Sequence, residues 1–227
     1  MSGGYFGKLP ARADFVSKHC PAGFLRVWEP FLIQGLTQSR LDLRDAWEEA
    51  YMTMPVWRFW MAFEATGSRH SKKLAGAFMP SIDKVGREFP LTVFVSASAD
   101  EEGRPSENWF AALETVLLKT LDESETFDGF QKDVANLVTP VLTQPDLDDQ
   151  IVCKPEDLDA MPDTEILLRS EFMCNAGKKR YGFTCSGLPH AEAFLWFLVP
   201  ENRSCSTSTK GGVEKPRGRH FSEDHQA

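Results

Sequence analysis

The segment Pro55-Val56-Trp57-Arg58-Phe59-Trp60-Met61-Ala62-Phe63 predicts the central strand of the fold. Apolar side chains occupy both the odd and the even positions, and successive residues of a strand point to opposite faces of its sheet. Such a strand belongs in the interior of a sheet that is covered on both sides. We therefore predict that Trp57 and Phe59 are buried and that Arg58 points to the other face. A buried arginine needs a carboxylate partner, and Asp14 or Asp83 is the expected one.

Further strands surround this one. Residues 73–79 and 91–97 are apolar runs joined by a loop that is too short for a helical crossover, so they are expected to pair antiparallel. Residues 164–173 and 180–185 predict a hairpin across the basic turn 175–179. Residues 4–9 predict a short strand or an extended entry.

Helical spacing of apolar residues alternates with these strands. It predicts helices over residues 21–40 (with a fresh start at Pro30), 42–51, 106–121 (capped by Ser106), 127–142 and 190–199. Together these elements predict an α/β (α+β) fold, with an antiparallel-rich mixed sheet flanked by helices. We expect a single domain over residues 1–200 and a disordered tail over residues 201–227, where apolar residues nearly vanish. The stretch 99–105 is the one plausible linker within the body, and residues 144–163 predict a long surface loop.

The composition indicates a soluble protein with an acidic surface. The formal net charge is −8 among 227 residues, which disfavours binding to nucleic acid and to anionic membranes. No apolar run reaches the roughly 18–20 residues that a membrane span requires. The sequence begins Met-Ser-Gly-Gly and predicts no signal peptide. We therefore expect a cytoplasmic protein without membrane insertion.

Metal and cofactor chemistry has little support in the sequence. The five cysteines (Cys20, Cys153, Cys174, Cys185 and Cys205) form no CxxC pair, so ordinary reduced thiols are expected, and Cys174 and Cys185 are the pair that a hairpin could bring face to face. The sequence contains no HxxxH or HExxH pattern and no Walker A loop. We predict no catalytic residues, no metal site and no cofactor.

Two charged, glycine- and proline-containing segments remain to be explained. They are Gly4-Tyr5-Phe6-Gly7-Lys8-Leu9-Pro10-Ala11-Arg12-Ala13-Asp14-Phe15-Val16 and Met79-Pro80-Ser81-Ile82-Asp83-Lys84-Val85-Gly86-Arg87-Glu88-Phe89-Pro90-Leu91. Glycine permits positive φ and proline fixes φ, so both segments predict rigid turns. The candidate functional residues are the charges of these segments and of the strand: Lys8, Arg12, Asp14, Arg58, Asp83 and Arg87. They either hold the two loops together or form an interaction surface on them.

These two segments and the strand segment Thr53-Met54-Pro55-Val56-Trp57-Arg58-Phe59 resemble, in the same order, the N-terminal domain of the TagF/ImpM family of bacterial type VI secretion. In that family Ala13 is usually glycine, and we expect Ala13 to keep a negative φ here. The resemblance implies a non-enzymatic accessory protein that represses assembly of the secretion apparatus after translation. It also implies a partner, the cytoplasmic forkhead-associated scaffold protein of the system.

The alternative is a small-molecule or nucleotide-dependent enzyme that uses the carboxylates and arginines of the two loops. A ligand-sized cavity where Asp14, Asp83 and Arg87 converge would favour the enzyme. An open, partly apolar patch beside the loops would favour the interaction protein. The oligomeric state stays open at this point.

Overall fold

The computed structural model describes residues 3–63, 72–97, 103–143 and 167–202. Their main feature is a seven-stranded sheet in the order β2-β1-β5-β4-β3-β8-β9, in which every pairing is antiparallel. The strands are β1 (Gly4–Gly7), β2 (Val16–Lys18), β3 (Trp57–Phe63), β4 (Lys72–Met79), β5 (Leu91–Ala97), β8 (Leu167–Ala176) and β9 (Lys179–Cys185). A separate two-stranded ribbon pairs β6 (Arg104–Pro105) with β7 (Leu142–Thr143).

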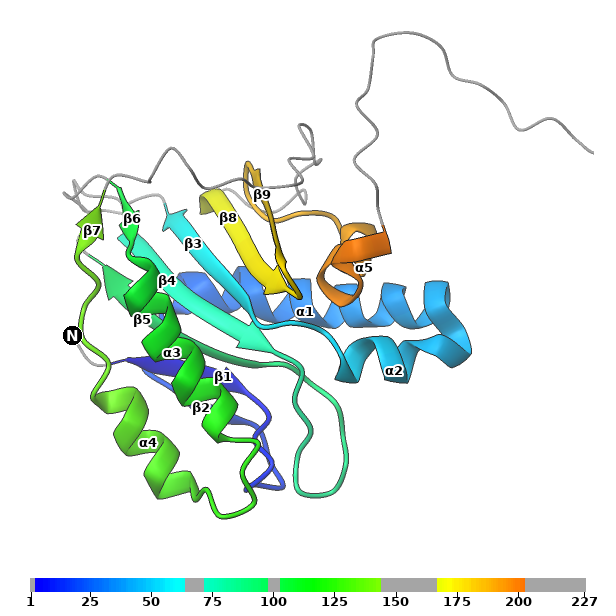
Figure 1. The fold of residues 1–227 in the computed structure, drawn as a ribbon, viewed down its shortest axis with the longest axis horizontal. Helices are drawn as coiled ribbons and strands as arrows, with labels where there is room; N and C mark the ends of the chain where they lie inside the picture. The colour runs from blue at the N-terminus through cyan, green and yellow to red at the C-terminus, as the bar shows by residue number, and fades with distance from the viewer. Residues whose placement is uncertain (1–2, 64–71, 98–102, 144–166, 203–227) are drawn as a thin grey trace, which may run out of the picture.

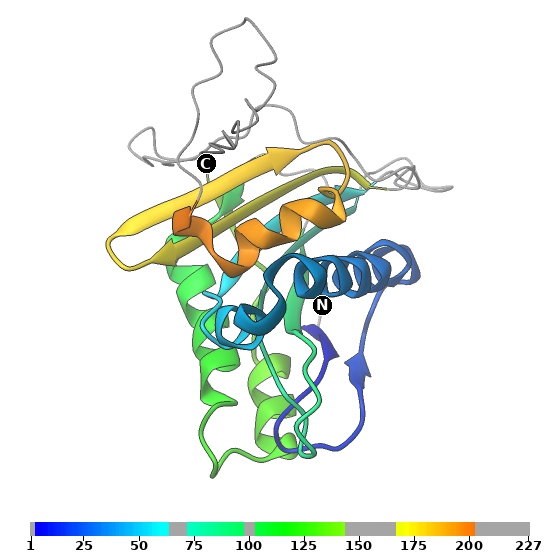
Figure 2. The same cartoon turned by 90° about the vertical axis from the view of Figure 1, so that its right-hand side faces the viewer.

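Helices cover both faces of the sheet, so the arrangement has three layers (Figures 1 and 2). On one face lie α1 (Ala22–Leu43), α2 (Trp47–Met52) and α5 (Phe194–Leu198), with short 3-10 turns at Arg44–Ala46, Ala191–Ala193 and Pro200–Asn202. On the other face lie α3 (Glu107–Lys119) and α4 (Phe127–Ala135). The predicted fold class, an antiparallel-rich sheet flanked by helices, is confirmed.

The interior strand β3 faces both cores, as its sequence predicts. Trp57 and Phe59, each 1% exposed, belong to the aromatic core under α1 and α5, whereas Trp60 belongs to the core under α3. Arg58 is also buried and faces α3. The predicted faces of β3 are therefore correct, and both cores share the same central strands.

Helix α1 is longer than expected and passes through Pro30 without a break. The prediction of a fresh start at Pro30 is wrong, because Pro30 lies on the exposed side of the helix. Pro30 has no amide hydrogen, so the carbonyl of Arg26 lacks its helical hydrogen bond. Because Arg26 is exposed, water can donate to this carbonyl instead. The helix extends to Leu43, so the separate helix expected over residues 42–51 is reduced to the turn Arg44–Ala46 and α2.

Two later helices are shorter than their predicted ranges. The helix predicted over residues 127–142 ends at Ala135, and the chain then extends to form β7. Pro140 disfavours helical backbone at the residue before it, which is consistent with this exit. The helix predicted over residues 190–199 is a 3-10 turn followed by the five residues of α5. Ser106 caps α3 as expected, because its hydroxyl accepts a hydrogen bond from the Trp109 amide at 3.3 Å.

The β8–β9 hairpin is present, but its register keeps two cysteines apart. Cys174 lies opposite Tyr181, and Cys185 lies opposite Ser170. The expectation that a hairpin could bring Cys174 and Cys185 face to face is therefore wrong. The predicted loop over residues 144–163, residues 203–227 of the predicted tail 201–227 and residues 99–102 of the linker 99–105 lie outside the described residues. Residues 201–202 belong to the 3-10 turn Pro200–Asn202, and Arg104–Pro105 form β6.

Candidate functional site

Strand pairing places the two motif loops side by side. The first loop joins β1 to β2 over residues 8–15, and the second joins β4 to β5 over residues 80–90. Because β1 pairs antiparallel with β5, the end of β1 lies beside the start of β5, and both loops leave the sheet at the same end of these strands. Gly7 makes this close approach possible, because its φ is +134° and a Cβ there would lie 2.0 Å from the carbonyl oxygen of Pro90.

Asp83 is the centre of the contact between the loops. Its Oδ1 accepts hydrogen bonds from the amides of Val85 (3.0 Å) and Arg87 (2.9 Å). Its Oδ2 lies 3.1 Å from Lys8 Nζ and 2.6 Å from Arg87 Nε. Arg87 also donates to the carbonyl of Ala13 on the first loop. We call Lys8, Asp83 and Arg87 the loop clamp, since their contacts join the two loops.

Burial and hydrogen bonding have opposite effects on the pKa of Asp83. The side chain is fully buried, and burial by itself would raise the pKa of the carboxyl. The hydrogen bonds from Arg87, Lys8 and Val85 outweigh burial and hold the pKa of Asp83 well below its usual range. The carboxylate is therefore ionised at neutral pH, and its charge is balanced locally.

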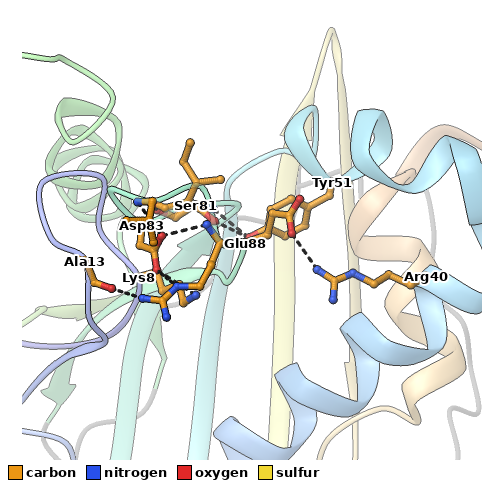
Figure 3. Close-up of polar contacts among 10 residues, drawn as sticks. Lys8, Ala13, Arg40, Tyr51, Ser81, Asp83 and Glu88 are labelled. Atoms are coloured by element: carbon orange, nitrogen blue, oxygen red, sulfur yellow. Dashed lines mark hydrogen bonds and ion pairs between the residues drawn. The ribbon is translucent and has the colours of Figure 1, made fainter.

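The second loop is also tied to the helices on its other side (Figure 3). The Tyr51 hydroxyl of α2 donates to the carbonyl of Ser81 at 2.9 Å and accepts from the amide of the same residue at 3.0 Å. Arg40 of α1 pairs with Glu88 at 3.0 Å, and its guanidinium lies 4.1 Å from the ring centroid of Trp47. The loop is thus held by the first loop, by α1 and by α2.

An open cavity of about 620 Å³ adjoins this last contact. Two arginines and three carboxylates line it together with Trp47: Arg40, Arg44, Asp45, Glu48 and Glu88. Neither Asp83 nor Arg87 lines this cavity. Within the described residues no group of three or more histidine, cysteine or acidic side chains is placed to hold a metal ion.

Arg58 lies apart from the loops. Its Nε and Nη2 donate to the two carboxylate oxygens of Glu114 at 2.6 and 3.0 Å, and its Nη1 donates to Glu107 at 2.6 Å. The prediction that Asp14 or Asp83 pairs with Arg58 is therefore wrong. The side chain faces α3, and α3 carries both carboxylates. The sequence alone did not tell which helix covers this face.

Arg12 and Asp14 are adjacent to the loop clamp without belonging to it. The Arg12 guanidinium lies 4.8 Å from the ring centroid of Phe127, at the start of α4. The backbone carbonyl of Arg12 accepts a hydrogen bond from the Lys84 amide at 2.9 Å. Asp14 is exposed and forms no ion pair within the part of the chain that the structure describes. Ala13 keeps a negative φ, as expected, since positive values occur among the described non-glycine residues at His19 and Arg44.

Two exposed apolar residues on the loops were not predicted from the sequence. Phe15 is 51% exposed, and its ring centroid lies 4.8 Å from that of Phe89 in an edge-to-face arrangement. Val85 is 65% exposed at the tip of the second loop. The available signal was an isolated apolar residue in a charged turn, which does not reveal by itself whether the side chain faces the core or the solvent.

No helix within the described ranges has the length and apolar character needed to cross a membrane. A comparison with curated protein sequences gave no significant match. Among solved structures, the chain is similar to the crystal structure of PA0076 from Pseudomonas aeruginosa PAO1, with 28% sequence identity and a TM-score of 0.68. The match covers 94% of this chain and 100% of the other.

A family model described as the TagF N-terminal domain, type VI secretion system-associated, matches residues 4–137. This range is more than half of the chain, and it contains both motif loops, the strand β3 and the loop clamp. The protein therefore belongs to the family of type VI secretion system-associated proteins that carry a TagF N-terminal domain.

Proposed function

We propose that this protein is a non-enzymatic, cytoplasmic regulator that represses type VI secretion by binding the forkhead-associated scaffold protein of the system. The binding surface in this proposal is the exposed outer side of the two motif loops, residues 12–15 and 84–87. One observation carries the proposal: Phe15 and Val85 are 51% and 65% exposed on loops that buried contacts hold in place. Rigid loops with exposed apolar groups lose little entropy on binding, which favours protein recognition.

The state of Asp83 supports binding rather than catalysis at the loops. Both of its carboxylate oxygens are occupied by donors from the protein, and its pKa is lowered. A general base needs a pKa near the working pH and access to a substrate proton, and the buried Asp83 lacks both properties. An open, partly apolar patch beside the loops is the arrangement expected of an interaction protein.

Binding of the purified forkhead-associated scaffold protein tests the proposal. Val85→Ser should weaken binding about tenfold, because removing an interface anchor commonly costs that much. Val141→Ser is the matched control, because Val141 is 74% exposed and belongs to the segment entering β7, away from the loops (Figure 1). Circular dichroism and thermal unfolding establish that both variants are folded.

The same variants should behave consistently in the secreting bacterium. Val85→Ser should release secretion from repression, and Val141→Ser should not. The proposal is wrong if the folded wild-type protein does not bind the scaffold protein. It is also wrong if an Asp83-dependent turnover of a small molecule or nucleotide is measured.

A further inference from the structure

A third loop lies beside the two motif loops. The connection from α3 to α4, residues 120–126, reaches the same end of the molecule in both views (Figures 1 and 2). Contacts link the three segments in sequence. The Lys84 amide of the second motif loop donates to the backbone carbonyl of Arg12 in the first motif loop. The Arg12 guanidinium lies 4.8 Å from the ring centroid of Phe127, the residue that directly follows the third loop.

This third loop adds two exposed leucines to the same end. Leu118, in the last turn of α3, is 48% exposed, and Leu121 is 62% exposed. With Phe15 and Val85 they make four of the ten large apolar side chains that are exposed within the described residues. Isolated exposed apolar residues need no explanation. We take these four together because the loops that carry them reach the same end of the molecule.

Hydrogen bonds and ion pairs also hold the third loop in place. The Leu121 amide donates to the carbonyl of Leu118 at 3.0 Å, and the Glu125 amide donates to the carbonyl of Asp122 at 2.9 Å. Lys119 bridges Glu125 and Asp133 at 3.0 and 2.6 Å. The leucines are therefore presented on an ordered backbone, and binding would not have to order the turn.

Charges of opposite sign flank the apolar residues. Arg12 and Lys84 are exposed on the motif loops, whereas Asp122 and Glu123 are exposed on the third loop. A membrane surface or a nucleic acid presents one sign of charge and would be repelled by the acidic side. A protein surface can match both signs at once.

We infer that residues 12–15, 84–85 and 118–123 form one three-loop surface that docks a protein. The contact area of this partner is apolar at its centre, acidic where it meets Lys84 and basic where it meets Glu123. The inference rests on the proposed function for the motif-loop part of the surface and for the identity of the partner. It extends the binding surface beyond the motif loops to a segment that is not part of either motif.

Affinity for the purified scaffold protein separates the third loop from the motif loops. The double variant Leu118→Ser/Leu121→Ser should weaken binding about tenfold. The control Leu168→Ser/Val141→Ser removes side chains of similar exposure, 48% and 74%, and should change binding less than about twofold. If Val85→Ser weakens binding but Leu118→Ser/Leu121→Ser does not, the three-loop surface is wrong and the proposed function stands.

The charge pattern gives a test of the kind of partner. Lys84→Glu and Glu123→Lys should each weaken binding of a protein partner, because each reverses one side of the match. On an anionic membrane Glu123→Lys would instead strengthen binding. Sedimentation with vesicles of phosphatidylglycerol and phosphatidylethanolamine measures this directly, and binding of the wild-type protein to these vesicles would overturn the inference.

Photo-crosslinking in the secreting bacterium tests the surface without assuming a partner. A photoreactive amino acid at position 85 or 121 should capture the same protein, and one at position 141 should not. Capture of a protein other than the scaffold at both positions would keep the surface and overturn the proposed partner. Capture at position 85 alone, capture of a second copy of this chain, or no capture at either position would overturn the three-loop surface.

Discussion

Lys8 and Asp83 form a buried ion pair, with Lys8 Nζ 3.1 Å from Asp83 Oδ2, that joins the β1–β2 loop to the β4–β5 loop. The two side chains are 7% and 0% exposed, so the buried Lys8 depends on Asp83 for its countercharge. Asp83 also holds the second loop in shape through the amides of Val85 and Arg87. One carboxylate thus sets both the conformation of a loop and its position beside another.

Asp83→Asn should lower the melting temperature by about 5–10 °C, because the buried Lys8 loses its countercharge. Asp14→Asn is the matched control, since Asp14 lies on the first loop but is exposed. It should shift the melting temperature by no more than about 2 °C. Differential scanning calorimetry measures both, and equal melting temperatures for the two variants would show that the clamp contributes no stability.

Acid should remove the contribution of Asp83 to stability. An unfolded aspartate has a pKa of about 3.9, and folding lowers the pKa of Asp83. The stabilisation is therefore complete above the unfolded pKa and is lost as the pH falls through the folded one. The difference in melting temperature between wild type and Asp83→Asn should stay constant from about pH 7 to 5 and should narrow below about pH 4. A difference that widens in acid would contradict this sign.

Arg58→Met should destabilise the protein by about 2–3 kcal/mol, because Glu107 and Glu114 lose their shared partner. The cost stays below the roughly 3–5 kcal/mol of a fully buried unpaired charge, since the Glu114 side chain is 21% exposed and that of Glu107 is 49% exposed. Arg40→Met is the control, because its ion pair with Glu88 is more exposed and should contribute no more than about 1 kcal/mol. Urea unfolding gives both values. A stability unchanged by Arg58→Met would show that the contacts with α3 are dispensable.

Two glycines with positive φ should respond differently to alanine. At Gly7 an added Cβ would lie 2.0 Å from the Pro90 carbonyl oxygen, so Gly7→Ala must separate the two loops where they leave the sheet. At Gly86, with φ +84°, no atom lies within 4 Å of an added Cβ, so Gly86→Ala costs only backbone strain of about 1 kcal/mol. Gly7→Ala should therefore lower the melting temperature clearly more than Gly86→Ala. The reverse order would mean that the close approach at Gly7 does not matter.

Residues 1–200 are predicted to behave as one unit in limited proteolysis. The two cores lie on opposite faces of the same strands, with Phe59 and Leu74 in one and Trp60 and Ala75 in the other. A cut within residues 99–103 would leave α3 and α4 separated in sequence from the strands they cover. The two fragments should therefore elute together in size-exclusion chromatography and unfold in one transition in calorimetry. Two independently folded fragments would contradict a single domain.

Local residue patterns were sufficient to predict the interior strand and the general architecture. Alternation along Trp57-Arg58-Phe59-Trp60 placed the apolar side chains on both faces, and helical spacing of apolar residues predicted helices where α1 and α3 lie. These are local properties, because the period of a strand or helix fixes which side chains share a face. The sequence did not determine the exit of α4, since the segment after Ala135 pairs with β6, a strand distant in sequence.

The ion-pair partners and the exposure of the loop residues depend on how the elements pack together. Charge and spacing singled out Lys8, Asp83 and Arg58 alike, yet only the packing of α3 on the sheet gave Arg58 the carboxylates of Glu107 and Glu114. Tyr51 and Glu88 fix the second loop through contacts between segments distant in sequence. Phe15, Val85, Leu118 and Leu121 became candidates for one surface only when the pairing of β1 with β5 and the position of α3 placed three loops at one end. Long-range contacts of this kind depend on which elements pack together, and no local pattern of residues encodes that choice.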